Sequence, residues 1–269
     1  MLVAQLSDTH VVHDGATFFG HDSERYLRDA IAAIIALPIR PTFALVSGDL
    51  VNRGKASEYT RFAAIMATLP MPYFVVPGNH DDRDVLRTIL PPDSFGRARG
   101  PRIRYAMDDF DVRLIGLDGN RPPSPGAELD DEAFAWLETT LARAKPTILA
   151  VHQPPFRTGL HYLDIFGFRG ARRLRALVAR HPHVGIVASG HIHCVREAHV
   201  GTARFVSAPS TAPTTLPLLF MHGRIVGTSS EAPGFATHAW SVADGFRTTF
   251  YRRDARDAYV ASAARSHAG

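Results

Sequence analysis

The chain has 269 residues, of which 45% are hydrophobic and 21% charged, so its composition excludes global disorder and allows one large α/β domain. A net charge of +4 gives no reason to expect a nucleic-acid partner, and no run of 18 apolar residues predicts a membrane span. The single Cys excludes an intramolecular disulfide, and no signal-peptide pattern precedes the first strand, so we expect a cytoplasmic protein.

The first part of the chain alternates short apolar strands with amphipathic helices. We expect strands at 2–6, 42–46 and 70–76, and helices at 23–37 and 57–69. This order predicts parallel strands joined by right-handed crossovers. In open α/β sheets, ligands collect at the carboxyl ends of such strands.

The second part continues with a similar alternation. The expected elements are a helix at 81–90, a strand pair at 103–107 and 112–117, helices at 130–144 and 169–180, and strands at 147–151 and 184–188. The remainder, to about Tyr251, predicts mostly antiparallel strands and loops. We therefore expect a single domain over 1–252 and a C-terminal tail over 253–269.

Metal-binding residue types follow five of the predicted strands: Asp8, His10, Asp49, Asn79, His80, His152, His191 and His193. Imidazole nitrogens mixed with carboxylate and amide oxygens suit divalent Fe, Mn, Zn or Co. Apart from His80, these are seven ligands, which are too many for one transition ion but fit two ions that share a carboxylate. We expect Asp49 to be the shared ligand, because its two oxygens can be divided between the metals.

In this order, the blocks Asp8-x-His10, Gly48-Asp49, Gly78-Asn79-His80-Asp81, His152 and Gly190-His191-x-His193 resemble the motifs of the calcineurin-like metallophosphoesterases. The resemblance implies an α/β fold, a four-layer α-β-β-α sandwich with two mixed central sheets. It assigns the first metal to Asp8, His10, Asp49 and His193. It assigns the second metal to Asp49, Asn79, His152 and His191.

Within this superfamily the chain is similar to the class III cyclic-nucleotide phosphodiesterase and glycerophosphodiesterase group. The similarity implies hydrolysis of small phosphodiesters, such as cAMP or glycerophosphodiesters, by in-line attack of a metal-bound hydroxide. We expect Asp49 and His80 to be catalytic, with His80 as the acid or phosphate-oxygen donor. Some members carry a further His where residues 207–217 have only Thr214 or Thr215, which weighs against a glycerophosphodiester preference.

Several alternatives stay open at this point. The same motifs occur in phosphomonoesterases and nucleases, and a metal-free interaction scaffold would require lost ligands. Asp81 either orients His80 or caps the next helix, and we favour the cap. Phe18, Phe19 and His21 either line a leaving-group pocket or pack against the sheet. The Pro-rich C-terminal third favours a homo-oligomer, a dimer or larger.

Overall fold

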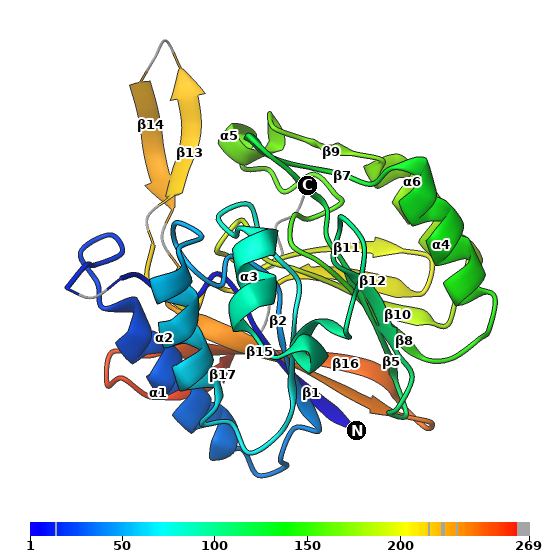
Figure 1. The fold of residues 1–269 in the computed structure, drawn as a ribbon, viewed down its shortest axis with the longest axis horizontal. Coiled ribbons are helices and arrows are strands. Elements are labelled where there is room, and N and C mark those ends of the chain that lie inside the picture. Colours follow the sequence, from blue (N-terminus) through cyan, green and yellow to red (C-terminus); the bar gives the residue numbers. More distant parts are fainter. Residues whose placement is uncertain (14, 215, 222–223, 230, 263–269) are drawn as a thin grey trace.

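The structure, a computed structural model, describes residues 1–13, 15–214, 216–221, 224–229 and 231–262. Two six-stranded sheets face each other, and helices cover the outer face of each sheet (Figure 1). Both sheets are mixed, because each combines parallel central strands with antiparallel neighbours. The predicted four-layer α-β-β-α sandwich is confirmed.

The first sheet has the strand order β17-β16-β15-β1-β2-β3. Its strands are β1 (Leu2–Leu6), β2 (Phe43–Val46), β3 (Tyr73–Val75), β15 (Gly234–Ser241), β16 (Gly245–Arg253) and β17 (Tyr259–Ser262). The helices of this half are α1 (Ser23–Ile35), α2 (Ala56–Met66) and α3 (Arg83–Ile89). β1, β2 and β3 pair in parallel, as the alternating strand and helix pattern predicts.

The second sheet has the order β11-β12-β10-β8-β5-β4. Its strands are β4 (Arg104–Met107), β5 (Arg113–Leu117), β8 (Thr147–Val151), β10 (Val184–Ser189), β11 (Arg196–Val200) and β12 (Ala203–Ser207). The outer face is covered by α4 (Asp131–Leu141) and α6 (Ala171–Arg180), which bury Phe134, Leu137, Leu174 and Leu177. Apolar side chains of both sheets, such as Leu6 and Ile148, form one core between them. Burial of this apolar area is the main force that holds the sheets together.

Short elements lie around the carboxyl ends of the central strands: β6 (Asn120–Arg121), β7 (Ser124–Glu128), α5 (His161–Asp164), β9 (Phe168–Arg169), β13 (Leu216–Met221) and β14 (Arg224–Ser229). The short helix η1 (Pro92–Phe95) follows α3 instead. β6, β7 and β9 form a small sheet, and the β13–β14 hairpin projects from the body (Figure 1). Among the described residues, no helix combines the length and the apolar character needed to cross a membrane.

The segment expected to be a C-terminal tail, 253–269, begins as part of the first sheet. β17 pairs antiparallel with β16, and the ring of Tyr259 lies 5.4 Å from that of Phe235. This aromatic contact gives an alanine-rich segment an anchor that its composition does not indicate. Residues 263–269 lie outside the described part of the chain.

Candidate metal centre

The predicted ligands come together at the carboxyl ends of the central strands, where turns after β1 and β2 face turns after β8 and β10. Their donor atoms form two groups, and within each group these atoms lie within 4.8 Å of one another. The first group is Asp8, His10, Asp49 and His193, and the second is Asp49, His152 and His191. Asp49 belongs to both groups, as expected for a shared ligand.

In the first group, the donor atoms of all four side chains lie close together. His193 Nε2 lies 3.2 Å from Asp8 Oδ1 and 3.1 Å from His10 Nε2. His10 Nε2 also lies 3.7 Å from Asp49 Oδ2. The other ring nitrogen of His193, Nδ1, lies 3.0 Å from Thr214 Oγ1. Thr214 therefore orients His193, and Thr215 lies outside the described residues.

In the second group, a hydrogen bond to a backbone carbonyl fixes the tautomer of His152. Its Nδ1 donates a hydrogen bond of 2.8 Å to the carbonyl of Ser47, which leaves Nε2 without a proton in the neutral ring. That Nε2 lies 3.3 Å from Asp49 Oδ2, and the ring of His191 lies 5.2 Å from the ring of His152. A backbone carbonyl behind a histidine is the usual support of a metal-ligating imidazole.

Two unsatisfied buried polar atoms belong to the predicted ligands of the second metal. Asn79 Oδ1 and His152 Nε2 make no hydrogen bond within the described part of the chain. Leaving such a group unpaired costs about 1–3 kcal/mol, and buried polar atoms in native proteins are normally paired. Both are atoms that would coordinate a cation. The mixture of imidazole, carboxylate and amide donors therefore fits divalent transition metals.

The backbone of the centre is strained. Among the described residues other than glycine, eight have a positive φ, and five of these are predicted ligands: Asp8, His10, Asp49, His191 and His193, with φ between 42° and 68°. This left-handed conformation costs about 1–2 kcal/mol per residue, and such strain concentrates at functional sites. Backbone hydrogen bonds of 3.0 Å, from Asp8 to Gly48 and from His10 to Asp49, hold the turns in place.

The protonation states of the predicted ligands favour the binding of cations. Burial raises the pKa of Asp8, but His193 outweighs it and lowers this pKa to about 2. Burial likewise opposes ionisation of Asp49, yet His152 holds its pKa well below the usual value. Burial lowers the pKa of His10 and of His191 to about 3. Ionised carboxylates and neutral imidazoles are the forms that bind metals.

His152 differs from the other two buried histidines. Burial disfavours its charge, but the neighbouring Asp49 raises its pKa to about 9. With its proton on Nε2, this ring neutralises part of the carboxylate charge of the centre. It must lose that proton to act as a ligand.

Asp81 is not the helix cap that we favoured. Asp82 caps α3, since its side chain accepts hydrogen bonds from the backbone of residues 84 and 85. The Asp81 carboxylate instead accepts hydrogen bonds from Leu50 N at 3.1 Å, Gly78 N at 2.7 Å and the Tyr59 hydroxyl at 3.0 Å. It thereby ties the turn that carries Asp49 to the turn that carries Asn79. The sequence motif does not reveal this role, because both turns reach Asp81 only through the fold.

A cavity of about 610 Å³ opens in front of the centre. It is lined by His10, Thr17, Phe18, Phe19, Asp49, Asn52, Asn79, His80, Pro125, Tyr162, Leu163, Phe166, His191 and His193. His80 lies at the exposed edge, where its Nδ1 donates a 2.8 Å hydrogen bond to the Asn52 carbonyl. The backbone N–H of His80 donates to Asp49 Oδ1 at 2.9 Å. The imidazole of His80 is thus held beside the predicted metal ligands with Nε2 available.

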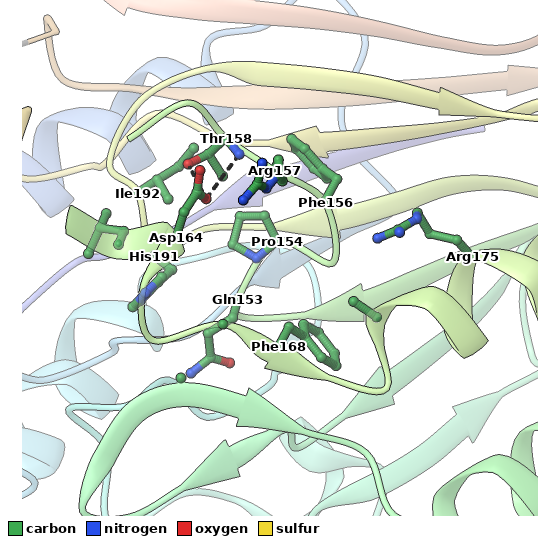
Figure 2. A pocket seen from close by; sticks show the side chains of 14 residues that line it. Gln153, Pro154, Phe156, Arg157, Thr158, Asp164, Phe168, Arg175, His191 and Ile192 are labelled. Carbon is green, nitrogen blue, oxygen red and sulfur yellow. Dashed lines mark hydrogen bonds between the residues drawn. The ribbon is translucent and has the colours of Figure 1, made fainter. Parts of the chain in front are cut away.

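A second cavity, of about 220 Å³, shares His191 and Leu163 with the first (Figure 2). The cationic side chains Arg157 and Arg175 line this second cavity and do not line the first. Figure 2 also shows Asp164 hydrogen-bonded to Thr158, at 2.9 Å between Oδ1 and Oγ1. The two cavities therefore differ in charge although they meet at one predicted ligand.

Phe18 and Phe19 both line the cavity, but only Phe18 also packs against a predicted ligand. The Phe18 ring is buried and stacks on His10, with centroids 4.1 Å apart, so it packs behind a ligand. Phe19 is 60% exposed and lines the cavity. His21 is exposed and lies against Tyr26 rather than in the cavity. Sequence alone could not separate these neighbours, because their roles depend on the path of one turn.

Two mixed sheets face each other, and histidine and carboxylate side chains form two donor groups at the ends of their strands. This combination defines a metal-dependent phosphoester hydrolase. Residues 1–195 match the family model of the calcineurin-like phosphoesterases, and the chain belongs to this family.

Curated relatives and solved structures agree with this assignment. The glycerophosphodiester phosphodiesterase GpdQ of Enterobacter lignolyticus is 33% identical over 78% of this chain and 77% of its own length. A probable cyclic nucleotide phosphodiesterase of Rhodococcus erythropolis is 31% identical over 79% of this chain and 70% of its own length. A dimetal phosphatase from Danio rerio shares the fold, with a TM-score of 0.65 at 14% identity over 93% of this chain and 95% of its own.

Proposed function

We propose that this protein hydrolyses small phosphodiesters at two divalent transition metal ions. Asp8, His10, Asp49 and His193 would hold one ion, and Asp49, Asn79, His152 and His191 the other. The observation that carries the proposal is the position of Asp49 in both donor groups, in a cavity that Asn79, with its unsatisfied Oδ1 atom, also lines. The phosphodiesterase relatives above support a diester as the substrate.

The carboxylates Asp8 and Asp49 leave the charge of two divalent ions only partly neutralised, so the centre attracts an anionic phosphate. When bound, the ions would lower the pKa of a water molecule towards neutrality and stabilise the charge that develops on the phosphate oxygens. The protein supplies the strained turns that fix the ligands, and the buried bonds that keep those turns in place.

His80 is the proposed acid or phosphate-oxygen donor. Its Nδ1–H is committed to the Asn52 carbonyl, so a proton that it transfers must come from Nε2 of the charged ring. The side chain lines the same cavity as Asp49 and Asn79, within reach of a substrate in that cavity. Acid–base groups of this kind typically accelerate reactions by about 10²–10⁴-fold.

We further propose Fe, Mn, Zn or Co as the metals, a single domain that extends beyond residue 252 to include β17, and a cytoplasmic homo-oligomer. The donor set supports a transition metal rather than magnesium or calcium. The one Cys, Cys194, is buried and forms no disulfide within the chain, which is compatible with a reducing compartment. Light scattering of the purified protein would give the oligomeric state directly.

A substrate panel tests the proposed function. The protein is reconstituted with each metal and assayed with bis(p-nitrophenyl) phosphate, p-nitrophenyl phosphate, cyclic AMP and glycerophosphodiesters. We expect diesters to be hydrolysed with a higher kcat/KM than the monoester. Faster turnover of the monoester would favour a phosphomonoesterase, and no turnover with any metal would favour a non-enzymatic scaffold.

A further inference from the structure

The turn that carries Phe19 has a residue that is unusual for its backbone conformation. Phe18 and His21 exchange two backbone hydrogen bonds of 2.9 Å, which closes a two-residue hairpin over Phe19 and Gly20. Both central residues are left-handed, with φ of 48° and 78°. Turns of this type favour Asn-Gly or Gly-Gly, because a bulky side chain destabilises the left-handed first position. Phe19 therefore stands where folding stability alone would select another residue.

The Phe19 side chain is also exposed. The residue is 60% exposed, and its ring makes an edge contact with the buried Phe18 ring, with centroids 4.8 Å apart. Phe18 in turn stacks on the predicted ligand His10. A strained backbone that presents an exposed aromatic ring to a cavity indicates that the ring has a ligand.

Another part of the cavity wall is also aromatic. Tyr162 in α5 and Phe166 just after it have centroids 5.6 Å apart and line the same cavity as Phe19. Apart from histidines, the only ionisable group of the described lining besides Tyr162 is the predicted metal ligand Asp49. The part of a substrate that extends from the metal centre into this cavity therefore meets aromatic, largely uncharged surface.

Two polar side chains are available on the lining. Neither the Asn52 amide nor the Thr17 hydroxyl has a hydrogen-bond partner within the described part of the chain, and both line the cavity. An amide offers a donor and an acceptor side by side, which matches the edge of a nucleobase. A glycerol group would leave the aromatic rings without a stacking partner. A quaternary ammonium group can lie against aromatic rings, but it neither donates nor accepts a hydrogen bond and would leave the Asn52 amide without a partner.

We propose that Phe19, with Tyr162 and Phe166, binds a nucleobase and makes the enzyme selective for nucleoside phosphodiesters such as cyclic nucleotides. This inference rests on the proposed phosphodiesterase function and specifies its substrate class. Phe19 acts on selectivity and takes no part in the bond-breaking step. Stacking of a base on an aromatic side chain corresponds to about a 5-fold to 150-fold effect when the ring is removed.

The test compares two substrates across three variants of the metal-loaded enzyme. We expect Phe19→Ala and Phe19→Asn to lower the ratio of kcat/KM for 3′,5′-cyclic AMP to that for glycerophosphoethanolamine by at least about 5-fold, mainly through KM. Ile165→Ala is the matched control. Ile165 is 74% exposed close to Tyr162 and Phe166 but does not line the cavity. We expect this control to leave the ratio unchanged.

Stability separates recognition from a structural role. Asn suits the left-handed turn better than Phe, so Phe19→Asn should raise the thermal unfolding midpoint while it lowers the selectivity ratio. If Phe19 served only to hold the loop, the variant would instead unfold at lower temperature and lose both activities together. Adenosine binding, followed by calorimetry on metal-free and metal-loaded protein, should weaken in Phe19→Ala and persist in Ile165→Ala.

The outcomes distinguish this inference from the proposed function. An unchanged substrate ratio in both Phe19 variants would overturn the role of Phe19. So would a wild-type preference for glycerophosphocholine over cyclic AMP. If the metal-loaded wild type hydrolyses no diester, the proposed function fails. In that case, adenosine binding that depends on Phe19 would still support a nucleobase site, and its absence would reject one.

Discussion

The floor and the mouth of the cavity are built in opposite ways. The floor, formed by the strand-end turns that carry the seven predicted ligands, is largely buried, and several of its strained residues are held by backbone hydrogen bonds. The mouth, formed by the turn at residues 18–21 and by α5, is more exposed, and the backbone hydrogen bonds of each of these segments join residues that are close in sequence. Because the floor is fixed by the whole fold, it can keep one geometry for metals. The mouth can vary without loss of the fold, so it is the natural place for substrate selectivity.

A buried polar chain beneath the floor joins the two sheets. Gln5 Nε2 donates to Ser47 Oγ at 2.8 Å and to the Ser189 carbonyl at 2.9 Å, so one side chain on β1 contacts the ends of β2 and β10. Behind it, His238 Nε2 donates to Gln5 Oε1 at 2.8 Å. This chain sets the two halves of the metal centre at a fixed separation, since each half belongs to a different sheet.

The largest effect is expected from the shared ligand. Asp49→Ala removes a donor from both groups, and metal charge stabilises such transition states by several kcal/mol, so diester hydrolysis should fall at least about 10³-fold. Metal content, measured by mass spectrometry after dialysis, should fall below two ions per chain. Asp109→Ala, an exposed aspartate, is the control and should keep both properties. Full activity of Asp49→Ala would contradict a dinuclear mechanism.

His80→Ala should separate chemistry from metal binding. We expect kcat for diesters to fall by about 10²–10⁴-fold while two metals per chain are retained. The defect should be smaller with a p-nitrophenyl leaving group, because a weakly basic oxygen needs little protonation. An equal defect for good and poor leaving groups would show that His80 does not act as the acid.

The positioning role of Asp81 predicts a smaller effect. Asp81→Asn replaces one acceptor oxygen by an amino group in a site that receives several N–H donors. Supporting residues around metal ligands typically contribute about 10–100-fold to metal affinity or activity, and we expect a loss in that range for metal affinity, measured by calorimetry. Tyr59→Phe removes one hydrogen bond to Asp81, together with the bond that the hydroxyl accepts from Asp82 N, and should have a weaker effect of the same kind on metal affinity. Unchanged affinity in Asp81→Asn would exclude this role.

The smallest effect concerns His238, which lies beneath the floor, and the dependence of folding stability on pH. Burial, aided by Arg204, lowers the pKa of His238 to about 3. An unfolded histidine titrates near pH 6.5, so below that pH the unfolded chain gains a proton that the folded chain does not bind. Stability should therefore fall with decreasing pH, by up to about 1.4 kcal/mol per pH unit for this group, until the pH approaches the folded pKa. Between pH 6 and 5, urea unfolding of metal-free His238→Gln should show a shallower pH dependence than the wild type, and an equal slope would contradict the prediction.

Sequence reasoning located the floor far better than the mouth. The strands at 2–6 and 147–151 were predicted to the residue, because apolar runs that end at polar turns mark both boundaries. The ordered motifs then placed Asp8 and His193 at one centre although they are 185 positions apart. The positive φ values of the ligands left no signal in residue type, since Asp and His usually adopt other conformations.

The mouth gave no comparable signal. Strands of two residues near it, such as β6 and β9, are too short to show a period, and α5 has only four residues.

Two supporting contacts of the floor were also not predicted. The partners of Asp81 and the support of His193 by Thr214 depend on contacts between distant segments. Such contacts follow from tertiary packing, which local patterns do not encode.

The most direct test of the metal centre is anomalous diffraction from crystals grown with Mn²⁺. We predict two peaks per chain between the turns that follow β1, β2, β8 and β10, with Asp49 bound to both ions and Asn79 Oδ1 bound to one. A single peak without Asp49, or peaks only elsewhere on the protein, would contradict the two-metal centre.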